Sequence, residues 1–146
     1  MDESVPGPWS VDPATLLQLR IDKAKQAYQR QDFDNAFVEA EELLDDHPTH
    51  PEGLLISGQA ALAMGDSTTA LAALSLYTEH HSPTAEVLLT LAAAAFESVD
   101  FPRAVDFAEQ ATRLQPDLAE AWYYMGMAME RQGQIDAATQ RFERAA

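Results

Sequence analysis

The histidines of this chain are the first residues whose type and spacing could carry chemistry. His47 and His50 stand in the run HPTH, and His81 lies 34 residues after His47, next to His80. Imidazoles bind zinc, but a zinc site needs three or four ligands in a fixed geometry. Histidines near helix C-termini are also favoured by the helix dipole alone. We therefore expect these side chains to be structural and expect no metal site.

The acidic run EAEELLDD, residues 39–46, is the second candidate. Carboxylates bind calcium when a glycine-containing turn folds them around the ion, and this run has no such turn. It is typical of a solvated helical face. The sequence also lacks an HExxH motif, a glycine-rich phosphate loop and a nucleophile elbow. We expect a protein that is not an enzyme and that needs no cofactor.

The net charge of the chain limits the classes of partner that it is expected to bind. It carries 24 acidic and 9 basic residues, a formal net charge of −15, and no cysteine. Binding to nucleic acids depends largely on neutralising phosphates, so an acidic chain is not expected to bind them. No apolar stretch is long enough to span a membrane, and the first residues do not resemble a secretory signal. We expect a cytoplasmic protein with a neutral or basic protein partner and no membrane insertion.

Candidate binding residues must be placed by larger elements, and these elements recur every 34 residues. Segments of similar pattern begin at residues 17, 51, 85 and 119, with no insertion between them. Alanine occupies one place in all four segments, and a second place holds only alanine or glycine. Small residues at matched places allow two helices to approach closely. These places are Ala36, Ala70, Ala104 and Ala138, and Ala24, Gly58, Ala92 and Gly126.

Each segment is predicted to form a helix, a short turn and a second helix. Short polar turns lie inside the segments, and proline at positions 48, 83 and 116 marks the junctions between them. Asp12 and Pro13 have the pattern of an N-cap followed by a first-turn proline. The predicted helices cover residues 13–30, 33–46, 51–64, 67–80, 84–98, 101–114, 118–132 and 135–146.

The pattern resembles the tetratricopeptide repeat (TPR) family. In the last segment the large and small residues of that family are matched by Trp122, Met125, Gly126, Met129, Ile135, Ala138, Phe142 and Ala145. The resemblance covers residues 17–146 and implies an all-α, right-handed superhelical solenoid of antiparallel helix pairs. It also implies a concave surface lined by the first helix of each repeat. Some members clamp C-terminal carboxylates with Lys, Asn and Arg; only Lys25 suits that role here, so such a clamp is not expected.

Spacing on each first helix identifies a face opposite the packing residues, and this face is largely apolar and aromatic. Exposed apolar surface of this kind usually marks an interaction site. The predicted groove residues are Ile21, Lys25, Tyr28, Leu55, Gln59, Leu62, Leu89, Ala93, Phe96, Tyr123 and Met127. An acidic rim is predicted at Glu52, Glu86 and Glu120. Two simpler explanations remain open: the apolar residues pack between adjacent repeats or against the N-terminal arm, and the glutamates serve only as first-turn acids.

These observations predict an interaction scaffold that binds a protein or peptide segment in an apolar groove with an acidic rim. Two alternatives stay open: a regulatory or targeting module of a larger protein or enzyme, and a homo-oligomerising assembly unit. The predicted organisation is an arm over residues 1–12 and a repeat domain over 13–146, with repeats at 17–50, 51–84, 85–118 and an incomplete 119–146. In the arm, Trp9 is a candidate to fold back onto the first repeat. The end of the chain is expected to be a boundary within a longer protein.

Overall fold

A computed structural model describes residues 11–146, which form eight α-helices and no strand. Every helix end lies within one residue of the predicted bound, so the all-α repeat architecture is confirmed. The arm and Trp9 are predictions that fall largely or wholly outside the described residues. The helices are α1 (Pro13–Gln29), α2 (Phe33–Asp46), α3 (Pro51–Ala63), α4 (Ser67–His80), α5 (Ala85–Glu97), α6 (Phe101–Leu114), α7 (Ala119–Arg131) and α8 (Ile135–Ala145).

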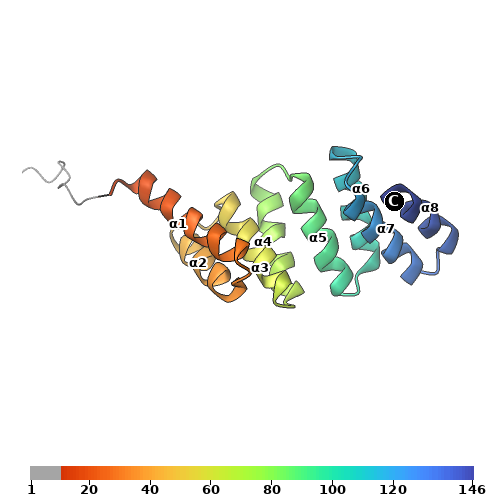
Figure 1. The fold of residues 1–146 in the computed structure, drawn as a ribbon, viewed down its shortest axis with the longest axis horizontal. Helices are drawn as coiled ribbons and strands as arrows, with labels where there is room; N and C mark the ends of the chain where they lie inside the picture. The colour runs from red at the N-terminus through yellow and green to blue at the C-terminus, as the bar shows by residue number, and fades with distance from the viewer. Residues whose placement is uncertain (1–10) are drawn as a thin grey trace, which may run out of the picture.

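The helices stack as antiparallel pairs along one long axis, in chain order (Figure 1). Each first helix packs against its own second helix and against the second helix of the preceding pair. The first helices α1, α3, α5 and α7 also contact one another in sequence, whereas consecutive second helices do not. First helices therefore line one side of the array together. No helix within residues 11–146 is both long enough and apolar enough to cross a bilayer.

Matched small residues set the distance between the two helices of each pair. The four alanines at the invariant place are all buried, as are the four Ala or Gly residues on the first helices. A Cβ on Gly58 would lie 2.7 Å from Leu74 Cγ, and one on Gly126 would lie 2.7 Å from Phe142 Cε1. Such a distance is too short for carbon atoms, so a residue larger than glycine would force the pair apart.

The turn inside each repeat ends its first helix in the same way. Residues with positive φ recur every 34 positions: Gln31 and Val99 at 61°, Gly65 at 83° and Gly133 at 79°. The amide after each of them bonds to the carbonyl five residues earlier, as Asp100 N does to Ala95 O at 2.9 Å. This is the Schellman arrangement, which satisfies carbonyls at a helix C-terminus. The repeated turn gives all four pairs the same geometry.

N-caps begin several of the helices. The Asp12 carboxylate accepts from Thr15 N at 3.0 Å and from Thr15 Oγ1 at 2.7 Å, with Pro13 at the first helical position, as predicted. Asp66 and Asp100 accept from Thr69 N and Arg103 N at the equivalent places of α4 and α6. Each of these caps satisfies a backbone amide in the first turn of its own helix.

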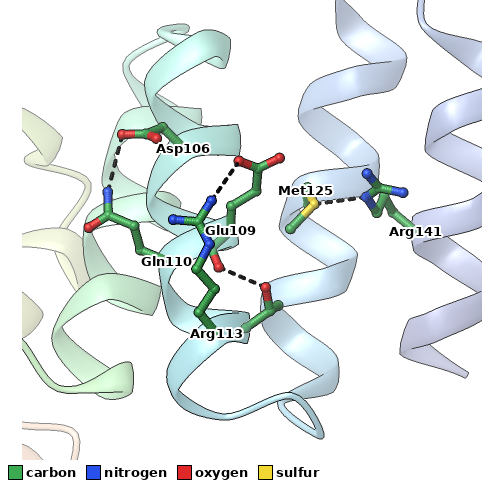
Figure 2. Close-up of polar contacts among 7 residues, drawn as sticks. Asp106, Glu109, Gln110, Arg113, Met125 and Arg141 are labelled. Atoms are coloured by element: carbon green, nitrogen blue, oxygen red, sulfur yellow. Dashed lines mark hydrogen bonds and ion pairs between the residues drawn. The ribbon is translucent and has the colours of Figure 1, made fainter.

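Figure 2 shows polar contacts in the last two repeats. On α6 Gln110 donates to Asp106 at 3.1 Å, and Arg113 lies 3.9 Å from Glu109. Between α7 and α8 Arg141 Nε donates to Met125 Sδ at 3.0 Å. The first two contacts lie within α6, and the third joins a first helix to its own second helix.

Candidate functional site

Two adjoining hollows, of about 640 and 510 Å³, run across the first helices. They share Tyr28, Gln59 and Glu86, so we treat them as one feature and call it the groove. Every lining residue belongs to α1, α3, α5 or α7, and none belongs to a second helix. The lining residues are Lys25, Tyr28, Gln29, Glu52, Leu55, Ile56, Gln59, Leu62, Ala63, Glu86, Leu89, Thr90, Ala93, Glu97, Glu120 and Tyr124.

Ten of the fourteen predicted groove and rim residues line this feature. They are Lys25, Tyr28, Leu55, Gln59, Leu62, Leu89, Ala93, Glu52, Glu86 and Glu120. The three glutamates also stand in the first turns of α3, α5 and α7. A first-turn carboxylate complements the helix dipole, so each of them is placed for both roles that the sequence left open.

Ile21 requires a correction, because it is only 3% exposed. It was placed on the open face, but α1 packs against both α2 and α3 and the side chain is enclosed. Tyr123 occupies the equivalent repeat place and is 50% exposed, with its ring 5.8 Å from that of Phe142. It does not line either hollow. Within the described residues no further first helix lies alongside α7, which explains why the same place is buried in one repeat and open in another.

Phe96 and Met127 are half-buried and also lie outside the lining. The Phe96 ring packs 5.4 Å from Phe101 and 6.1 Å from Tyr124, with the Arg131 guanidinium 5.5 Å above it. Phe96 therefore supports the Tyr124 ring rather than forming the groove surface itself.

The spacing argument missed Tyr124, Thr90 and Ile56, which lie 34 residues apart, and also Glu97, Ala63 and Gln29. The first three directly follow the predicted Tyr123, Leu89 and Leu55. Successive residues on a helix differ by about 100°, and an interacting stripe can be at least that wide. A wider stripe repeated at the 34-residue period would have identified them.

Charge is distributed unevenly along the groove. At the α1 end Lys25 forms an ion pair with Glu52, and this hydrogen bond raises the pKa of Lys25. Gln59 Nε2 donates to Glu86 Oε1 at 2.9 Å. No ion pair within residues 11–146 involves Glu86, Glu97 or Glu120. The larger hollow therefore contains three carboxylates without a cationic partner.

These carboxylates contribute to the raised pKa values of two tyrosines in the same hollow. Burial raises the pKa of the Tyr28 hydroxyl, with a further contribution from the charge of Glu86. Burial likewise raises the pKa of Tyr124, with contributions from Glu97 and Glu120. Ionised tyrosine would be disfavoured beside these anions, so both phenols are neutral donors near pH 7.

His47 and His50 lie at the junction between the first two repeats, while His80 and His81 lie at the end of α4. His50 Nδ1 accepts from Gly53 N at 3.3 Å and so caps α3, while His81 Nε2 lies 2.6 Å from Thr49 O. The rings of His47 and His50 are 6.4 Å apart. No cluster of three or more His, Cys, Asp or Glu residues suited to a metal occurs in the part of the chain that the structure describes.

Comparison with known proteins bears on the repeat unit. Residues 107–140 match a family model described as a tetratricopeptide repeat. That match covers one 34-residue period, and the helix-turn-helix unit it describes recurs along the whole array. This chain contains a tetratricopeptide repeat. No curated protein matches its sequence at a significant level.

Solved structures share the fold of this chain. A MamA crystal structure aligns with a TM-score of 0.81 at 24% identity, covering 88% of this chain and 70% of the other. MamA 41-end from Desulfovibrio magneticus RS-1 aligns with a TM-score of 0.80 at 19% identity, covering 92% and 73%. YrrB, described as a TPR protein with an unusual peptide-binding site, aligns with a TM-score of 0.77 at 14% identity, covering 86% and 65%.

Proposed function

We propose that this protein is an interaction scaffold that binds an extended peptide segment of a neutral or basic protein in the groove. The observation that carries the proposal is the shared lining: four helices from four repeats contribute to one continuous hollow surface. The lining combines leucine and tyrosine side chains with glutamate and glutamine, so it offers a peptide both apolar contacts and hydrogen-bonding groups. The peptide-binding site described for YrrB supports the same kind of function.

The size of the groove suits a short extended segment. Packed helices lie 8–10 Å apart, so four neighbouring first helices span roughly 25–30 Å. An extended chain advances about 3.3 Å per residue, so about eight residues would fill that length. Apolar side chains of the peptide would rest on Leu55, Leu62 and Leu89, which are only half-buried in the free protein. Burial of apolar surface would supply most of the binding free energy.

The test begins with a library of blocked random octapeptides selected on the wild-type protein. Binding of the selected peptides is then measured by fluorescence anisotropy on a Leu62→Glu/Leu89→Glu variant. We expect at least a tenfold loss of affinity, because two carboxylates would replace apolar side chains of the lining. The matched control is Val38→Glu/Leu114→Glu, which changes two exposed apolar residues of second helices. Equal affinity of the peptides for both variants would show that the groove is not the binding site.

Self-association is a second candidate, favoured by one observation. Tyr123 is half exposed beside Phe142, whereas Ile21 at the equivalent place is covered by the following repeat. A second copy could cover this end. Light scattering across a concentration series, with Tyr123→Glu as the disrupting variant, distinguishes an oligomer from a monomer.

A further inference from the structure

The larger hollow of the groove has a composition that selects one kind of side chain. Its lining includes two tyrosines, Tyr28 from α1 and Tyr124 from α7, and the apolar Leu89 and Ala93 from α5. Three carboxylates reach it from two helices: Glu86 and Glu97 from α5, and Glu120 from α7. Aromatic, apolar and acidic side chains are thus combined around about 640 Å³.

The cations of the protein lie elsewhere. Lys25 is engaged with Glu52 in the smaller hollow, and Arg131 lies over the Phe96 ring. Arg103 and Arg144 lie over Phe107 and Trp122, outside the groove lining. Within the described residues Glu97 and Glu120 have neither an ion pair nor a side-chain hydrogen bond. The hollow therefore has negative charge that a ligand can complement.

Resting on the proposed function, we propose that the hollow is a specificity pocket for one arginine side chain of the bound peptide. The guanidinium would pair with one of the two carboxylates, Glu97 or Glu120, that carry no ion pair in the described residues, and its flat face would lie against a tyrosine ring. Apolar residues of the same peptide would occupy the smaller hollow beside Leu55 and Ile56.

Arginine suits this pocket better than lysine for two reasons. Its planar guanidinium has five donors in a fixed fork, so it can form two parallel hydrogen bonds to one carboxylate. It is also weakly hydrated and stacks on aromatic faces, which reduces the cost of entering a partly apolar site. Lysine presents a compact and strongly hydrated charge that gains less from the tyrosines.

The experiment uses three matched libraries of octapeptides, acetylated and amidated at their ends. Arginine, lysine or citrulline is fixed at the fourth position, and the other positions vary among Ala, Leu, Ser and Gln. Citrulline keeps the shape of arginine and removes its charge. We expect the best arginine peptides to bind at least tenfold more tightly than their citrulline counterparts, with lysine between them. A difference of this size is expected because citrulline cannot make charge-assisted hydrogen bonds to the carboxylates.

Two double variants test whether the preference for arginine depends on the carboxylates of the larger hollow. Glu97→Gln/Glu120→Gln should bring arginine and citrulline peptides to equal affinity. Asp106→Asn/Glu109→Gln removes the same charge from the outer face of α6 and should preserve the preference (Figure 2). Equal affinities for arginine and citrulline peptides in the wild type would overturn the arginine pocket. If those peptides still lost binding in Leu62→Glu/Leu89→Glu, the proposed function would stand without the arginine pocket. If no peptide depended on the groove leucines, the proposed function itself would fail.

Discussion

Gly58 and Leu74 form a size-matched pair, since no Cβ fits on Gly58 while the Leu74 side chain fills the space above it. Gly126 faces Phe142 in the same way. At the equivalent places of the other two repeats, both members are alanine: Ala24 with Ala40, and Ala92 with Ala108, each pair in one buried cluster. A large side chain thus faces glycine and alanine faces alanine, so the two residues are matched in size across the helices of each repeat.

Gly58→Ala tests this pairing. Leu74 is fully buried and has no room to move, so we expect a loss of about 1–3 kcal/mol in the free energy of unfolding. Leu74→Ala should also destabilise the protein, by roughly 2–5 kcal/mol, because it leaves a cavity. The double variant recreates the Ala–Ala pair of the other repeats and should be less destabilised than the sum of the single changes. Urea unfolding measures all three, and strict additivity would contradict the pairing.

Val99 is predicted to be a site where the protein can be stabilised. It is 70% exposed at a φ of 61°, a conformation that branched side chains rarely adopt, while Gly65 and Gly133 occupy the equivalent place. Relief of this strain in Val99→Gly should raise the free energy of unfolding by about 1 kcal/mol, after the entropic cost of glycine. Thermal unfolding gives the answer. The reverse change, Gly65→Val, serves as the control. It should lower the free energy of unfolding, even though no atom lies within 4 Å of a Cβ placed on Gly65. Unchanged or reduced stability of Val99→Gly would show that Val99 is not strained.

We expect the free energy of unfolding to fall in mild acid, because the pKa of His50 is lowered in the folded protein. Burial lowers the pKa of His50 below 6.5, and the nearby His47 and His81 lower it further, against an opposing contribution from Glu52. Below pH 6.5 the unfolded chain therefore takes up a proton that the folded protein resists, and the free energy of unfolding decreases. Protonated His50 would also lose the Nδ1 acceptor that caps α3.

His50→Asn keeps a capping side chain and removes the titration. Melting temperatures between pH 7.5 and 5.5 should fall less steeply for this variant than for the wild type. The two proteins should run parallel above pH 7, where His50 is neutral in both states. Parallel slopes over the whole range would show that His50 does not couple to folding.

The sequence was sufficient for the repeat architecture, because its signals are local and occur four times. Proline at the junctions and the turn residues with positive φ fix the helix ends, so the predicted bounds agree with the structure to one residue. The groove was predicted less completely. Spacing along one helix gives the direction of a side chain but not the shielding by a neighbouring helix, so the burial of Ile21 could not be foreseen. Tyr124 was missed because the predicted stripe was too narrow.

The central claim is that a peptide binds across the first helices, and chemical-shift mapping of the protein amides tests it most directly. A selected octapeptide is titrated into the isotopically labelled protein. The account predicts that the largest shifts fall on residues 52–63 of α3 and 86–97 of α5, which form the centre of the groove. Shifts confined to α2, α4, α6 and α8, or to the end around Tyr123 and Phe142, would contradict it.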